Sequence, residues 1–183
     1  MKRIVLALFL VLFTAEGAFA QKKGETTFGV NMAYGIKVPN VGMELEMHYG
    51  ILDDIRLEAS FDYLFRNKAI NMWDLNLNAH YVIPVSKHVG LYPLVGFAYT
   101  NWGVKANWSV EDKEIADKIE DMGLLTEGKV SGHTGKIGAN LGVGADYNLS
   151  EKLALNLEAK YQLLSDLSQV VFSCGVTYKF LLW

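Results

Sequence analysis

The chain has 183 residues, of which 51% are hydrophobic and 20% are charged, and its formal net charge at pH 7 is −3. This length fits a single domain, and the acidic excess argues against nucleic acid as a partner. A single cysteine, Cys174, excludes an internal disulfide.

The N-terminus has the three parts of a secretory signal peptide. Lys2 and Arg3 form a positive segment, residues 4–13 are apolar, and Ala18-Phe19-Ala20 supplies small residues at a cleavage site. We expect cleavage after Ala20, which divides the chain into a signal peptide (1–20) and a mature domain (21–183). The alternative to cleavage is an uncleaved membrane anchor. The apolar run is too short to span a bilayer as a helix, which argues against this alternative. The residue directly after the cleavage site is Gln21 and not cysteine, which argues against a lipoprotein.

Eight segments follow in which every second side chain is apolar. They cover residues 27–35, 41–49, 55–65, 72–83, 89–102, 135–148, 153–163 and 170–180. The alternate positions carry many charged and amide side chains, which is too polar for the core of a soluble sandwich. The pattern therefore predicts an all-β fold, an eight-stranded antiparallel up-and-down transmembrane β-barrel with a polar interior. Pro93 lacks a backbone N–H, so we expect a bulge or local break there.

Aromatic residues recur near the ends of the apolar faces, where a membrane barrel carries its interfacial girdles. The set is Tyr34, Tyr49, Tyr63, Phe65, Trp73, Tyr81, Tyr99, Tyr147, Tyr161 and Tyr178. Cys174 shares the apolar face of the last segment, which indicates a small lipid-facing side chain rather than a nucleophile.

The connections form two sets. Counted from a periplasmic N-terminus, residues 50–54, 84–88 and 148–152 are short periplasmic turns. Residues 36–40, 66–71, 103–134 and 164–169 face outside, and only the third is long, as outer-membrane topology requires.

The long connection has a helical pattern of its own. Ser109 is suited to cap a helix, and Ile115, Ile119 and Met122 share one helical face. We predict a short amphipathic helix in this third extracellular loop, with a flexible acidic loop as the alternative. The candidate contact residues for a surface partner are Trp102, Trp108, Ile115 and Ile119.

By these features the chain resembles the small eight-stranded outer-membrane β-barrels of Gram-negative bacteria, the OmpA/OmpX-type family. The resemblance rests on the signal peptide, the glycine-rich strand at residues 138–147 and the closing strand at residues 175–180. It implies a multi-pass protein of the outer membrane, exported by a cleaved signal peptide. Members of the family usually end in an aromatic residue that the assembly machinery recognises, here Phe180 or Trp183.

The inward face carries charges that are able to neutralise one another. An eight-stranded barrel has room for side chains but not for an open aqueous channel, and an unpaired charge in a dry lumen is costly. We therefore expect a polar network that fills the lumen. Its members are Glu44, Glu46, Arg56, Glu58, Asp62, Lys136, Glu158, Lys160 and Lys179.

Catalytic chemistry has weak support in the sequence. A cluster of Ser60, His80 and Glu58 is conceivable as a nucleophile, base and acid. These residues also fit ordinary hydrogen bonding on a polar strand face, so we expect no enzymatic activity.

Metal binding has equally weak support. Glu44, Glu46 and His48 lie two residues apart on one face and offer carboxylate and imidazole ligands. Any polar strand face gives the same spacing, so we expect neither a metal nor a cofactor.

The leading functional hypothesis is a structural or surface-interaction barrel that acts through its extracellular loops. Its expected partners are outer-membrane lipid and lipopolysaccharide, the assembly machinery, and a surface protein or host ligand, with no nucleic acid. The first alternative is a narrow transporter or channel for small solutes, helped by a lateral opening near Pro93. The second alternative is a lipid-modifying outer-membrane enzyme.

Overall fold

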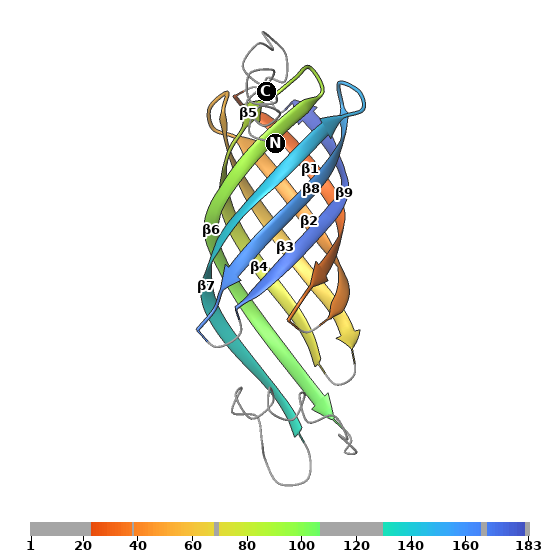
Figure 1. Ribbon diagram of the computed structural model, residues 1–183, viewed down its shortest axis with the longest axis vertical. Helices are drawn as coiled ribbons and strands as arrows, with labels where there is room; N and C mark the ends of the chain where they lie inside the picture. The colour runs from red at the N-terminus through yellow and green to blue at the C-terminus, as the bar shows by residue number, and fades with distance from the viewer. Residues whose placement is uncertain (1–22, 38, 68–69, 107–129, 166–167, 182–183) are drawn as a thin grey trace, which may run out of the picture.

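The computed structural model forms a closed, tilted cylinder of antiparallel strands (Figure 1). The structure describes residues 23–37, 39–67, 70–106, 130–165 and 168–181. The predicted signal peptide, the predicted loop helix and Trp183 lie outside these ranges. In the described part no residue is helical, and no helix there is long and apolar enough to cross a membrane.

The strands follow the chain in up-and-down order. They are β1 (Glu25–Gly35), β2 (Asn40–Gly50), β3 (Ile55–Asn67), β4 (Ile70–Tyr81), β5 (Ile83–Pro84), β6 (Val89–Ala106), β7 (Val130–Asn148), β8 (Leu153–Leu163) and β9 (Gln169–Leu181). Each strand pairs with the next except that β4 and β5 both pair with β6, and β1 pairs with β9 to close the cylinder. The two-residue β5 continues the line of β4 along β6, so the barrel has eight strands. The predicted eight-stranded antiparallel barrel is confirmed.

Burial alternates residue by residue along the strands. In β2 every second residue is buried in the lumen and the others are exposed on the outer surface. The outward residues are large and apolar, as at Phe97 (69% exposed) and Ile137 (78% exposed). A continuous apolar surface of this kind on a soluble monomer would drive association. On a barrel it is the surface that lipid covers.

Aromatic rings pack together on the outer surface. The Trp73 ring lies 5.6 Å from that of Tyr99 on β6 and 6.3 Å from that of Phe61 on β3, measured between ring centroids. Cys174 is also exposed on this surface, in the middle of β9. These side chains lie on the lipid-facing side of the strands, as the alternation predicts.

The turns at the end of the barrel where β1 begins and β9 ends share one hydrogen-bond pattern. Ile51 and Leu52 both donate to the carbonyl of Ile55, and the turns after β5 and β7 repeat this pattern from Val85 and Ser86 to Val89 and from Leu149 and Ser150 to Leu153. At the opposite end, β6 and β7 extend well beyond the other strands (Figure 1). They have 18 and 19 residues, against 11 to 13 in β1–β4, β8 and β9. Part of the expected loop at 103–134 is therefore a strand hairpin.

Pro93 interrupts one ladder only. The β6–β7 register runs unbroken through the pair Pro93–Val143. On the other side, pairing with β4 ends at His80–Leu94 and resumes in β5 at Ile83–Leu91 with the register unchanged. The expected local break is thus a gap of two residues, Tyr81 and Val82, in the pairing with β6, and no bulge forms in β6. Val82, Tyr92 and Leu94 form a buried apolar cluster on the lumen side of this gap.

Candidate functional site

The lumen contains more acidic than basic side chains. Among the described residues, seven buried carboxyl groups share it with Arg56 and Lys160 and with two histidines, His48 and His80. The seven are Glu44, Glu46, Glu58, Asp62, Asp74, Asp146 and Glu158. Since a carboxylate removed from water is costly unless it is paired, the arrangement of these groups decides what the lumen is able to do.

The structure places seven of the nine predicted network residues deep in the lumen: Glu44, Glu46, Arg56, Glu58, Asp62, Glu158 and Lys160. Lys136 and Lys179 are only half-buried. Lys136 lies opposite Thr100 on β6, and Lys179 forms an ion pair of 3.7 Å with Glu25 where β1 begins. These two lysines therefore belong to the outer parts of the lumen and not to its centre.

Lys160 on β8 is the central cation. Its Nζ lies 2.9 Å from Glu44 Oε2, 3.2 Å from Asp62 Oδ2 and 3.9 Å from Glu158 Oε1. Amide groups complete the pairing, because Asn31 donates to Glu44 at 2.7 Å and Asn76 donates to Asp62 at 3.1 Å. One ammonium group thus joins carboxylates from three strands across the full width of the lumen.

Arg56 on β3 anchors a second group nearer the end where β1 begins. Its Nη1 donates to Asp146 Oδ2 on β7 at 2.8 Å, and its guanidinium carbon lies 4.5 Å from the centroid of the Tyr92 ring. The Tyr92 hydroxyl donates to Glu158 at 3.1 Å and accepts from Asn156 at 2.7 Å. Asn156 in turn donates to Asp146 at 2.9 Å. Tyr92 therefore links the arginine group to the Lys160 group.

Gly144 on β7 makes room for this tyrosine. A Cβ added at Gly144 would collide with the hydroxyl end of the Tyr92 ring. We expect Gly144→Ala to displace Tyr92 from Glu158 and Asn156 and to lower the free energy of unfolding by about 1–3 kcal/mol, as overpacking does. Urea unfolding in detergent micelles measures this change. Ala139→Val adds bulk on the outward face of the same strand and serves as the control; an equal loss in both variants would contradict the role of Gly144.

Amide side chains close the lumen toward the end opposite the beginning of β1. Gln162 on β8 donates to Asp74 at 2.9 Å and accepts from Gln169 at 2.8 Å. Asn140 on β7 reaches Asn76 and Asn78 on β4, at 2.9 Å each. Together with the two cation groups, these contacts occupy the lumen along its length.

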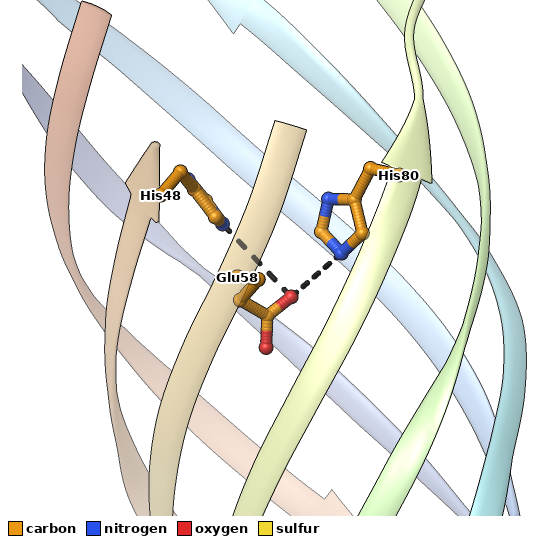
Figure 2. A group of neighbouring side chains, drawn as sticks. All are labelled: His48, Glu58 and His80. Atoms are coloured by element: carbon orange, nitrogen blue, oxygen red, sulfur yellow. Dashed lines mark ion pairs between the residues drawn. The ribbon is translucent and has the colours of Figure 1, made fainter. Parts of the chain in front are cut away.

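Two histidines and a glutamate meet in the arginine group (Figure 2). His80 Nε2 lies 2.7 Å from Glu58 Oε2, and His48 Nε2 lies 3.9 Å from the same oxygen. The other nitrogen of each ring is engaged, since Arg56 Nε donates to His80 Nδ1 at 3.0 Å and Thr27 Oγ1 lies 2.8 Å from His48 Nδ1. An arginine has no acceptor, so His80 accepts at Nδ1 and carries its proton on Nε2, facing Glu58.

Ser60 does not join this group. It lies opposite Asn76 and Glu46, whereas His80 lies opposite Arg56. Both His80 nitrogens already have other partners, and the Ser60 hydroxyl makes no hydrogen bond. Of the catalytic cluster considered from the sequence, only His80 and Glu58 are in contact. Ser60 is therefore not an activated nucleophile.

Trp102, named as a candidate surface contact, is buried in β6 with 1% of its surface exposed. It is therefore not presented to a partner outside the barrel. The other three candidates, Trp108, Ile115 and Ile119, lie outside the described residues.

The predicted network lacked five ionisable residues that the structure places within it: His48, Asp74, His80, Tyr92 and Asp146. All five occupy the alternate positions that face inward, and this alternation is the feature of the sequence that marks them. For Tyr92 the feature is weaker, because the neighbouring Pro93 interrupts the alternation.

Comparisons with known proteins agree with this architecture. A family model described as "Outer membrane protein beta-barrel domain" matches residues 6–180. No curated protein sequence matches the chain.

Solved structures resemble the chain over nearly its whole length. The N-terminal β-barrel domain of OprF from Pseudomonas aeruginosa has a TM-score of 0.62 at 16% identity, covering 87% of this chain and 100% of that one. Ail, the attachment invasion locus protein of Yersinia pestis, has a TM-score of 0.56 at 17% identity, covering 86% and 99%. Neisserial surface protein A has a TM-score of 0.62 at 13% identity, covering 85% and 96%. At these identities the likeness concerns the fold alone.

Proposed function

Because this chain belongs to the outer membrane protein beta-barrel domain family and is a multi-pass protein of the Gram-negative outer membrane, we propose that it is a closed, non-conducting barrel that acts through its extracellular surface. The observation that carries this proposal is the set of contacts across the lumen. Lys160 joins Glu44 to Asp62, Arg56 joins β3 to β7, and Gln162 joins β8 to β4.

An ion crossing this lumen would have to separate buried ion pairs. Removing one partner from such a pair costs about 3–5 kcal/mol, because the charge left behind has no water to replace it. Two pairs in series, at Lys160 and at Arg56, oppose passage at different levels of the barrel. The same contacts hold the wall rigid, which suits a scaffold that displays loops.

The hairpin of β6 and β7 is the natural site of a surface role. It extends beyond the other strands at the end opposite the beginning of β1 (Figure 1). Its connecting segment, residues 107–129, contains seven acidic residues and three lysines. One structure of Ail is a complex with the heparin analogue sucrose octasulfate. The acidic segment of the present chain favours a cationic partner over such a polyanion.

Single-channel recording in planar bilayers tests the proposal. We expect the purified barrel to produce no sustained conductance steps, at a protein load where a general porin produces them in every trial. Sustained steps in the wild type that change in amplitude with Arg56→Met or Lys136→Met would contradict a closed lumen and favour the narrow-channel alternative. Detergent alone is the blank.

A lipid-modifying activity has less support than either of these functions. It requires a nucleophile activated by a base near one rim, and Ser60 lies in mid-strand without a hydrogen-bonded histidine. We therefore propose that the barrel is not an enzyme.

A further inference from the structure

His48, Glu58 and His80 bring three possible metal-ligand atoms together inside the lumen. Glu58 Oε2, His48 Nε2 and His80 Nε2 lie within 4.8 Å of one another, on side chains that are at most 1% exposed. His80 Nε2 and Glu58 Oε2 form an ion pair of 2.7 Å, whereas His48 Nε2 lies 3.9 Å from the same oxygen and has no hydrogen-bond partner. Buried polar atoms are almost always satisfied, so an imidazole nitrogen left without a partner beside a buried histidine–glutamate pair requires an explanation. Figure 2 shows the two imidazoles and the carboxylate converging from β2, β3 and β4.

We propose that His48, Glu58 and His80 bind a divalent transition-metal ion of the zinc type inside the lumen. Imidazole nitrogen and carboxylate oxygen are ordinary ligands for zinc, and two histidines with one carboxylate form a common protein ligand set. Calcium and magnesium prefer all-oxygen sites, so this set selects against them. The site differs from the Glu44, Glu46 and His48 set that spacing alone suggested, because it draws on three strands.

The surrounding charge favours a bound cation. Glu46 lies next to the site, with its Oε2 at 3.7 Å from His48 Nε2, and neither of its carboxyl oxygens has a hydrogen-bond partner. Glu46 is therefore placed to provide a fourth ligand. Seven buried carboxyl groups against one arginine and one lysine leave the lumen short of positive charge, and a divalent ion would offset part of this excess.

The residues in contact with the second nitrogen of each imidazole support metal binding at His48 but oppose it at His80. Thr27 Oγ1, 2.8 Å from His48 Nδ1, is able to accept the proton that a metal-bound imidazole carries on its other nitrogen. At His80 the same position is occupied by Arg56 Nε, which donates. Metal binding at His80 Nε2 thus requires Arg56 to release Nδ1 while keeping Asp146 through Nη1. Arg56 and the metal compete for the same imidazole.

A small cavity adjoins the site on the side of the barrel end where β1 begins. It has a volume of about 10 Å³ and is lined in part by Thr27, His48 and Arg56 and bordered by the ion pair of Glu25 and Lys179. This volume is close to that of a single water-sized probe. Both residues of the pair keep part of their surface exposed, so the cavity lies close to the mouth of the lumen.

Zinc titration of the full barrel in detergent micelles tests the proposal. We expect one Zn²⁺ per barrel by calorimetry, and a Co²⁺ complex with the visible absorption of a four-coordinate site. His48→Gln/His80→Gln should weaken Zn²⁺ binding by about a hundredfold or more, since ligands matter at least as much as their supporting residues. The matched control is His88→Gln/His133→Gln, which removes two exposed histidines and should leave the affinity unchanged. Arg56→Gln should strengthen binding, because the competitor for His80 Nδ1 is gone.

The inference is overturned if Zn²⁺ binds the His48/His80 variant as tightly as the wild type, or if binding is lost in the His88/His133 variant. Weaker binding in Arg56→Gln would exclude coordination through His80 Nε2. Glu58→Gln keeps the shape and hydrogen bonding of the carboxyl group, so it provides a folded test if the double histidine variant fails to form a barrel. It too should weaken Zn²⁺ binding, and unchanged affinity would count against the site. These outcomes are independent of the conductance measurement, which tests closure of the lumen.

Discussion

Lys160→Met will lower the free energy of unfolding by about 3–5 kcal/mol, the cost of leaving buried carboxylates without their cation. Methionine has a similar length to lysine and fills the same space, so the loss is one of charge rather than of packing. Glu44, Asp62 and Glu158 all lie within 4 Å of Lys160 Nζ and lose their shared partner together. Urea unfolding in lipid vesicles, followed by tryptophan fluorescence, measures the change.

Two further variants make this measurement specific. Lys152→Met removes an exposed lysine in the turn between β7 and β8 and should change stability by no more than about 0.5 kcal/mol. Adding Glu44→Gln to Lys160→Met should recover part of the lost stability, because one of the carboxylates left without a cation is then replaced by a neutral amide. A Lys160→Met barrel as stable as the wild type would mean that water or ions fill the lumen in place of side-chain pairing.

Leu77→Arg will destabilise the inserted barrel by about 2–4 kcal/mol, because it places a charge near the middle of the lipid-facing band. Leu77 is 55% exposed on the outer surface of β4, between Trp73 toward one end and Tyr81 at the other. The measurement is the equilibrium between unfolded and inserted protein in phospholipid vesicles at a series of urea concentrations.

Leu52→Arg is the matched control for this prediction. Leu52 is 47% exposed, close to the value at Leu77, but it lies in the turn after β2. A charge there stays near the membrane surface, where the cost falls to about 0–1 kcal/mol. Equal effects at the two positions would mean that the outer face of β4 is in contact with water or with protein, not with lipid.

The strands follow from the sequence because lipid and lumen impose a period of two on every one of them. The predicted segment at 153–163 coincides with β8, and the segment at 41–49 differs from β2 by one residue at each end. The extension of β6 and β7 was missed for a physical reason. A hairpin beyond the membrane has no lipid-facing side, so Gly103–Ala106 and Val130–Thr134 need not show the alternation that marks the other strands.

The alternation along the strands predicts most of the residues in the lumen network, but it does not predict which of them contact one another. Alternation shows that Arg56 and Asp146 point inward, but these residues are 90 positions apart in the chain. Which inward residues meet depends on the stagger with which the sheet closes, and this is a property of the whole barrel. The contact of His48, Glu58 and His80 has the same origin, since it depends on the register of three adjacent strands.

The most direct test of the account uses the one cysteine of the chain, Cys174, which is exposed in mid-strand on β9. A nitroxide attached there, with the barrel in lipid vesicles, reports by electron paramagnetic resonance whether oxygen or a water-soluble nickel complex reaches it. A barrel whose apolar face is covered by hydrocarbon predicts frequent collisions with oxygen and few with nickel. Frequent collisions with nickel, or few with either, would show that water or protein covers this face, and would contradict the account.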